Sequence, residues 1–316
     1  MRLILPLSLL LAFVTDAFAS NEYMLTFRSS KKYAVRYFAD HELSTKDTAK
    51  EYAVVVVHGV DGGTTDCSRP LRDIVKNHSL EEKVFFVAPC FPVANMLDAD
   101  EKKRIAYWDD GNWQPGGDSP VIHNLSTYDV LDAVFNVLNN KQLYPNLKHV
   151  LFCGFSAGGQ VVSRYMAVTR IKARKGLTFD FAAGGPSTWL FFDRRAGWHC
   201  GLATRNRYTA SLSDKAMLKN VKSRFMLCFC GKEDTGLKDL SVGSTANEQG
   251  ANRYERFCNF KRHVGSLREI KHSFEFIDVE GEGHSWGCWY KIDIIRSICG
   301  QRVNSALKDQ LRVRPY

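Results

Sequence analysis

Runs of apolar residues recur along the chain and predict strands that are buried on both faces. The first run, Ala53-Val54-Val55-Val56-Val57, consists almost wholly of β-branched residues, which favour extended backbone. Five further runs of this kind cover residues 84–87, 149–153, 177–183, 224–230 and 273–279. Strands without a polar face belong in the middle of a sheet that is covered on both sides.

Between these runs, apolar residues recur at helical spacing. Residues 127–143 place five of them on one face: Val130, Leu131, Val134, Phe135 and Leu138. Similar patterns cover residues 158–171, 248–257 and 286–298. Strands that alternate with helices predict an α/β fold, in which helices cover both faces of a mostly parallel sheet. Two shorter alternating runs, residues 23–27 and 33–37, predict an antiparallel hairpin at its N-terminal edge.

Two long segments, residues 98–124 and 184–218, lack any clear pattern. They are called here the first and second irregular segments. Both follow predicted strands, so we expect lid-like or binding loops near a ligand crevice. Large aromatic residues in and near them are candidates for the wall of a substrate pocket and equally for core packing: Trp108, Trp113, Trp189, Phe191 and Trp286. No repeat or linker divides residues 20–316, which predicts a single domain.

The N-terminal residues 1–19 have the pattern of a secretory signal peptide. Arg2 supplies a positive start, residues 3–14 are apolar, and Ala17-Phe18-Ala19 fits a small-x-small cleavage site. The apolar run is shorter than the ~20 residues that span a bilayer, and no later segment reaches that length. We therefore expect cleavage near Ala19 and a secreted protein with no stable membrane span.

Secretion changes what the nine cysteines imply, because an oxidising compartment permits disulfide bonds. An odd number leaves at least one free thiol, and Cys153 is the best candidate because it ends a predicted buried strand. Cys228 and Cys230 share a face of one strand and are too close along the chain to pair easily. The other six are disulfide candidates whose pairing stays open: Cys67, Cys90, Cys200, Cys258, Cys288 and Cys299. Their scattered spacing predicts no metal site.

The formal net charge is +9, and the positive charges are dispersed, as in the basic run of residues 170–175. A solvated basic surface is the favoured interpretation over binding of a polyanion, although such a surface can favour anionic substrates. No nucleic-acid-binding motif occurs, so no nucleic acid partner is predicted. Asn77 and Asn124 begin Asn-x-Ser sequons, which are possible glycosylation sites.

The strongest chemical signal is Gly154-Phe155-Ser156-Ala157-Gly158. It has the form G-x-S-x-G and lies between a predicted buried strand and a predicted helix, where the motif forms a sharp turn that exposes the serine hydroxyl. Backbone N–H groups at the start of the helix point toward developing negative charge. Ser156 is therefore the predicted nucleophile.

The chain resembles the α/β-hydrolase superfamily through His58-Gly59, this serine turn and Gly283-His284. The resemblance covers roughly residues 25–300. A looser similarity to a group of secreted or predicted hydrolases rests on residues 107–113, 145–147, 158–165 and 185–189. The resemblance implies an α/β-hydrolase fold and an esterase- or lipase-like serine hydrolase, but it identifies no substrate.

A serine hydroxyl needs a general base, and in this superfamily the acid and then the histidine follow the serine along the chain. The histidine is therefore expected to be His284, in a Gly-rich loop after the last predicted strand. His272 precedes that strand and should lie at the opposite edge of the sheet. His58 is expected to have a structural role.

Asp234 is the expected acid, because it follows the predicted strand that ends at Cys230 and the Gly231 turn. The neighbouring Glu233 remains an alternative, whereas Asp278 lies inside a predicted strand. The oxyanion hole is expected to use the N–H groups of Ala157 and of Val60, with Asp61 or Gly59 as the next choices for the second donor.

These residues predict hydrolysis of a small-molecule or polymeric ester through an acyl-enzyme intermediate, with no cofactor and no metal. A serine peptidase or a thioesterase would use the same three residues, and a lyase acting on a cyanohydrin remains open. A non-catalytic binding protein on a hydrolase scaffold is a different class of function. The presence of a serine, a histidine and a suitable acid argues against it. Oligomeric state is not predicted.

Overall fold

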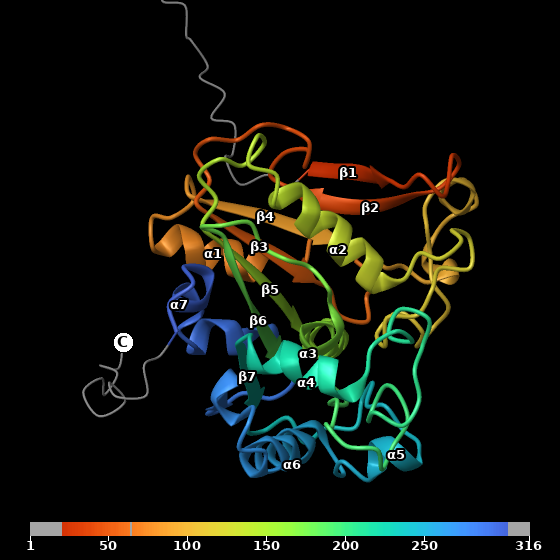
Figure 1. The fold of residues 1–316 in the computed structure, drawn as a ribbon, viewed down its shortest axis with the longest axis vertical. Coiled ribbons are helices and arrows are strands. Elements are labelled where there is room, and N and C mark those ends of the chain that lie inside the picture. Colours follow the sequence, from red (N-terminus) through yellow and green to blue (C-terminus); the bar gives the residue numbers. More distant parts are fainter. Residues whose placement is uncertain (1–20, 64, 303–316) are drawn as a thin grey trace, which may run out of the picture.

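One mixed sheet forms the centre of the molecule (Figure 1). The computed structural model describes residues 21–63 and 65–302, so the predicted signal peptide lies outside the described part. The strand order is β1-β2-β4-β3-β5-β6-β7-β8. The strands are β1 Asn21–Thr26, β2 Ala34–Ala39, β3 Tyr52–Val57, β4 Val84–Pro89, β5 His149–Phe155, β6 Thr178–Gly184, β7 Met226–Gly231 and β8 Phe274–Val279.

The direction of the strands follows the prediction. β1 pairs antiparallel with β2, and β2 pairs antiparallel with β4. The pairs β3–β4, β3–β5, β5–β6, β6–β7 and β7–β8 are all parallel. The predicted N-terminal hairpin at the edge of a mostly parallel sheet is confirmed.

Helices cover both faces of the sheet (Figure 1). On β3, Val55 and Val57 contribute to the core on one face, and Val54 and Val56 to the core on the other. The first face is covered by α2 Thr127–Leu138, α3 Ala157–Val168, α4 Asp214–Lys222 and α6 Arg253–Ser266. The second is covered by α1 Arg69–Asn77, α7 Ile294–Ile298 and the 3₁₀ helix η4 Trp286–Lys291. A short α5 spans Ser244–Asn247.

Helix boundaries depart from the sequence prediction; for example, α3 ends at Val168 instead of residue 171, and α6 ends at Ser266 instead of residue 257. The helix predicted over residues 286–298 is divided, because Ile292 is extended (φ −121°, ψ 151°) between η4 and α7. The helix predicted from residue 248 begins only at Arg253, where the Asn252 side chain accepts a hydrogen bond from Glu255 N–H at 2.9 Å. The helix predicted to reach residue 143 ends at Leu138. The helices α1 and α4 were not predicted.

The disulfide prediction is wrong, because all nine cysteines are free thiols. The sheet separates several of them: Cys153 and Cys288 lie in the core on one face, and Cys228 and Cys230 in the core on the other. Cys153 is fully buried, as expected for a small core residue, and burial raises the pKa of its thiol.

In residues 21–63 and 65–302, no helix is both long and apolar enough to cross a bilayer. Within the same ranges, no three His, Cys, Asp or Glu side chains are grouped so that they could hold a metal ion.

Candidate active site

Ser156 occupies a sharp turn between β5 and α3. Its backbone has φ 57° and ψ −119°, a conformation that is strained for any residue other than glycine. Two hydrogen bonds hold the turn: Ser156 N–H donates to Gly184 O at 2.8 Å, and Gln160 N–H donates to Ser156 O at 3.1 Å. The strain lifts the hydroxyl beyond the carboxyl end of the sheet, at the start of a helix.

The glycines that flank Ser156 are required by close backbone contacts. A Cβ atom on Gly158 would lie 2.1 Å from Val57 O, and one on Gly154 would lie 2.5 Å from the carbonyl carbon of Gly158. These distances are far below van der Waals contact. Glycine at both positions allows α3 to start directly against the loop that follows β3.

The structure brings Ser156, His284 and Asp234 into one hydrogen-bonded chain. His284 Nε2 lies 2.8 Å from Ser156 Oγ, and His284 Nδ1 lies 2.7 Å from Asp234 Oδ2. The Asp234 side chain is fully buried, whereas 27% of the His284 side chain is exposed. A buried carboxylate fixes the tautomer in which Nδ1 carries the proton, which leaves Nε2 free to accept the serine proton.

Asp234 and His284 come from the loops after β7 and β8, which are pressed together. Glu233 N–H donates to Glu282 O at 2.9 Å, and Lys232 N–H donates to Val279 O at 2.9 Å. A Cβ atom on Gly231 would lie 2.2 Å from Glu282 O, so only glycine allows this approach. The two loops therefore hold the Asp234 carboxylate and the His284 imidazole in a fixed position relative to each other.

The competing residues lie elsewhere. Glu233 is exposed, while Asp234 is buried against the imidazole. The Asp278 carboxylate accepts hydrogen bonds from Tyr254 and Lys261, at 3.0 Å and 2.7 Å. His272 is exposed, before β8, at the other end of that strand.

His58 is buried and holds the loop after β3. Phe91 N–H donates to its Nε2 at 2.8 Å, so Nδ1 carries the proton and donates to Gly59 O at 2.7 Å. Burial lowers the pKa of His58, which favours this neutral form. The Trp113 ring packs on the imidazole at 4.7 Å between centroids. His58 thereby supports the loop that carries Val60.

The two predicted oxyanion donors come from the start of α3 and from the loop after β3. Ala157 is the first residue of α3, and an N–H in the first turn of a helix has no partner within that helix. Val60 is 49% exposed and follows Val57 and His58, whose carbonyl oxygens lie against Gly158. Both donor assignments stay predictions.

Most of the aromatic residues proposed for the pocket wall are core residues. Trp108 and Trp189 are fully buried: Trp108 Nε1–H donates to Gly117 O at 3.1 Å, and Trp189 stacks on Phe260 at 4.5 Å. Trp113 is 2% exposed. These three side chains therefore take the core-packing role, which the sequence left open as the alternative to a pocket wall.

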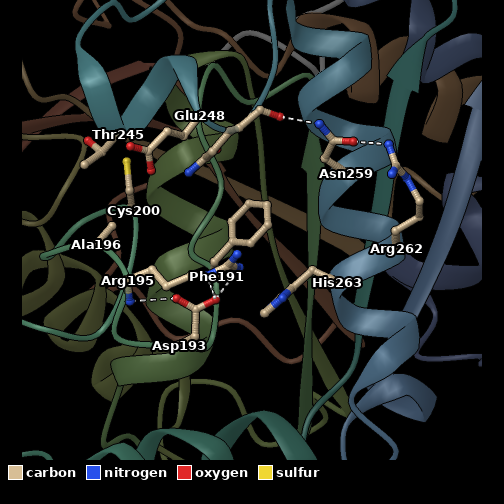
Figure 2. Close-up of a pocket in the computed structure, with 11 residues that line it drawn as sticks. Phe191, Asp193, Arg195, Ala196, Cys200, Thr245, Glu248, Asn259, Arg262 and His263 are labelled. Carbon is tan, nitrogen blue, oxygen red and sulfur yellow. Dashed lines mark hydrogen bonds and ion pairs between the residues drawn. The ribbon is translucent and has the colours of Figure 1, made fainter.

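Phe191 and Trp286 are half-buried. Phe191 lines a cavity of about 390 Å³. Figure 2 shows it beside Asp193 and His263, and the rings of Phe191 and His263 pack at 4.7 Å between centroids. None of the triad residues lines this cavity. The assignment of Phe191 and Trp286 to the substrate pocket stays a prediction. Trp286 packs at 5.6 Å on the Phe155 ring, which in turn lies 5.0 Å from the His284 ring.

The two irregular segments pack against each other. In the second segment, Trp198 Nε1–H and Asn206 Nδ2–H donate to Pro115 O of the first segment at 2.9 Å and 3.0 Å. Arg207 pairs with Asp118 at 2.6 Å. The second segment lacks helix and strand only up to Ser213, because the unpredicted helix α4 begins at Asp214, inside the segment that was expected to be irregular.

Arg164 of α3 ties both segments to the helix that begins after Ser156. Its guanidinium is fully buried and donates to His199 O at 3.1 Å and to Gln114 O at 3.4 Å. It also donates to Thr188 Oγ1 at 2.6 Å. Burial lowers the pKa of Arg164, and all these acceptors are neutral.

Sequence reasoning missed two residues beside the triad. Arg253, the first residue of α6, has Nη1 3.7 Å from Asp234 Oδ1. Gly185 has φ 49°, and a Cβ atom there would lie 3.4 Å from both Asp234 Oδ2 and His284 Cε1. The Gly184-Gly185 pair after a predicted strand was a visible signal for the second residue, but no sequence pattern points to the first.

Comparison with known proteins establishes the fold. No family model matches the sequence, and no curated protein sequence matches it. Among solved structures, the poly(3-hydroxybutyrate) depolymerase LpqC from Bordetella parapertussis superimposes with a TM-score of 0.63 and 18% identity, over 91% of this chain and 92% of that one. The chain has the α/β-hydrolase fold.

Two further structures with the α/β-hydrolase fold are similar. Poly(aspartic acid) hydrolase-1 from Sphingomonas sp. KT-1 gives a TM-score of 0.60 and 16% identity, over 84% of this chain and 93% of that one. The siderophore hydrolase EstB from Aspergillus nidulans gives a TM-score of 0.50 and 13% identity, over 96% of this chain and 99% of that one. At such low identity the likeness concerns the fold, and the site must be argued from this chain's own geometry.

Proposed function

We propose that this protein is a serine hydrolase that cleaves carboxylic esters through an acyl-enzyme intermediate. The observation that carries the proposal is the hydrogen-bonded chain from Ser156 Oγ through His284 to the buried Asp234 carboxylate. The α/β-hydrolase fold and the strained backbone of Ser156 support it.

The reaction follows from the positions of these atoms. Ser156 Oγ attacks the ester carbonyl carbon while His284 Nε2 takes its proton, and Asp234 stabilises the imidazolium that forms. The N–H groups of Ala157 and Val60 stabilise the tetrahedral oxyanion. The imidazolium returns the proton to the leaving alcohol, and the acyl group remains on Ser156. Water activated by His284 then releases the acid and regenerates the serine.

Substrate class and location are parts of the same proposal. The solved structures with this fold include proteins named as a polyester depolymerase and a siderophore hydrolase, which supports testing both polymeric and small esters. The signal-peptide pattern of residues 1–19 supports secretion. Asn77 and Asn124 are both exposed, which is compatible with glycosylation.

The proposal is tested by labelling the purified protein with a fluorophosphonate probe and mapping the modified peptide. We expect label on Ser156 that disappears when the protein is heat-denatured first, because only an assembled triad activates the hydroxyl. The labelled enzyme should lose its turnover of ester substrates. Parallel assays on p-nitrophenyl esters, thioesters, peptides and a soluble polyester oligomer separate ester hydrolysis from peptidase and thioesterase activity.

Ser156→Ala is the matched control, since it removes one oxygen atom and leaves the turn intact. It should fold with an unchanged circular dichroism spectrum and show neither label nor turnover. A folded wild-type protein that takes no label, or a Ser156→Ala variant that keeps substantial turnover, would refute the assignment of Ser156 as nucleophile.

A further inference from the structure

A second cavity lies at the amino ends of the parallel strands, away from the triad. Its volume is about 510 Å³, within the range of small-molecule sites. It is lined by Thr178 and Phe179 at the start of β6, by residues of the loop after α3, and by residues that follow α4. Ser156 and the triad loops lie at the opposite, carboxyl ends of the strands.

Four cationic side chains line this cavity: Arg170, Lys172, Arg224 and Arg302. Its lining in the described residues contains no aspartate or glutamate. Arg302 alone has an acidic partner, Asp180, at 2.6 Å. The other three line the same cavity and form no ion pair with the described residues.

Arg224 is the buried member of this cluster. The residue is 8% exposed, and its guanidinium donates to two backbone carbonyls, Met166 O and, at 2.7 Å, Thr169 O. Burial lowers the pKa of Arg224 to about 10, so the side chain stays charged at neutral pH. Carbonyl oxygens satisfy its N–H groups but do not neutralise its charge, and an unpaired buried charge favours an anion nearby.

Arg170 and Lys172 extend the positive potential to the rim. Arg170 donates to Ser211 Oγ and Tyr208 O, both at 2.8 Å, and neither acceptor is charged. Lys172 is exposed, and its ammonium makes no hydrogen bond or ion pair with the described residues. A hollow lined by one sign of charge concentrates field lines and attracts ions of the opposite sign.

We propose that this cavity binds a compact anion that carries two or more phosphate or sulfate groups. Three uncompensated cations match a multivalent ligand better than a single charge, and arginine offers N–H pairs that fit such oxyanions bidentately. The basic run of residues 170–175 then has a specific role, whereas the sequence favoured only a solvated surface. No residue of the triad lines the cavity, so this ligand does not compete with an ester substrate.

The test measures binding by isothermal titration calorimetry with two probes, inorganic tripolyphosphate and sucrose octasulfate. We expect saturable binding of at least one probe at one site per chain, weaker binding of orthophosphate, and an affinity that falls as salt is raised. The tighter probe identifies whether phosphate or sulfate groups suit the cavity. Ester hydrolysis at saturating probe should be unchanged.

Charge-reversal variants locate the site. Lys172→Glu should weaken the tighter probe by about tenfold or more, because it replaces attraction with repulsion at the rim. Lys102→Glu is the matched control: it changes the net charge equally at an exposed lysine outside the cavity and should leave the affinity within about twofold.

Both variants alter exposed side chains, so their melting temperatures should equal that of the wild type. If neither probe binds, the proposal is overturned. It is also overturned if the two variants weaken binding equally. Calorimetry measures the heat of anion binding and does not depend on catalysis. The binding result would therefore remain valid even if the protein showed no hydrolase activity.

Discussion

Arg253 lies directly behind Asp234, with Nη1 3.7 Å from Oδ1, and both side chains are almost completely removed from solvent. Asp234 Oδ2 faces His284, whereas Oδ1 receives no hydrogen bond from the described residues. Burial lowers the pKa of Arg253, and the charge of Asp234 opposes that lowering. A buried carboxylate without a counter-charge is costly, so Arg253 is a positioning residue that balances the charge of Asp234 and holds its side chain in place.

Replacing Arg253 with glutamine should therefore affect both stability and catalysis. Removal of one partner of a buried ion pair costs about 3 kcal/mol of unfolding free energy. The acidic limb of the pH profile of kcat/KM should move to higher pH, because a positive charge near the imidazole has been removed. Arg253→Lys keeps the charge and should keep the profile. An unchanged profile in Arg253→Gln would reduce Arg253 to a packing role.

The identity of the acid can be tested with two neighbouring amide substitutions. Asp234→Asn removes the negative charge that orients His284 and should lower kcat by about 10⁴-fold, as the loss of a triad acid does. Glu233→Gln alters an exposed side chain and should change kcat by less than about threefold. Steady-state kinetics on one p-nitrophenyl ester suffices. The opposite ranking would assign the role to Glu233.

Gly185 should be intolerant of any side chain for a catalytic reason. In Gly185→Ala the new Cβ would lie 3.3 Å from Phe155 Cζ, a tight contact with the ring that packs beside His284. Activity should fall by about tenfold or more, because a small misplacement of catalytic groups is costly. Gly111→Ala is the control, because Gly111 also has a positive φ (71°) but has open space around its Cβ position. Each variant should lose about 1 kcal/mol of stability from backbone strain, and only Gly185→Ala should lose activity. If Gly185→Ala and Gly111→Ala have equal activity, Gly185 has no role in positioning the triad.

Acid sensitivity of the fold should depend partly on His149. Burial, reinforced by the charge of Arg302, lowers the pKa of His149 to about 4. Its folded-state pKa is thus below the unfolded value of about 6.5. The stability that neutral His149 contributes to the folded state is therefore complete above pH 6.5 and is lost as the pH falls toward 4. Between pH 7 and pH 4.5, the wild type should lose about 2 kcal/mol more unfolding free energy than the His149→Gln variant. Urea titrations measure this difference. His272→Gln, at an exposed position, should retain the wild-type pH dependence.

Local signals predicted the strands and the serine turn well, because a buried strand and a G-x-S-x-G turn are encoded by contiguous residues. All the predicted strand runs coincide with strands of the sheet. Helix boundaries were less predictable, since the start of α6 depends on the Asn252 cap and the break before α7 on the extended Ile292. The burial of Trp189 depends on Phe260, and the position of Arg253 on how α6 packs beside the Asp234 loop. Such contacts between distant segments leave no local pattern.

One buried guanidinium, that of Arg164, donates hydrogen bonds to the carbonyl oxygens of both Gln114 and His199. The effect of a substitution in one irregular segment should therefore depend on the sequence of the other. A change in either segment that moves its carbonyl oxygen away from Arg164 strands a buried donor, at a cost of about 1–3 kcal/mol. Substitutions in the two segments should therefore be epistatic. Loop grafting in this scaffold will succeed only when both segments, together with residue 164, are transplanted as a single cassette.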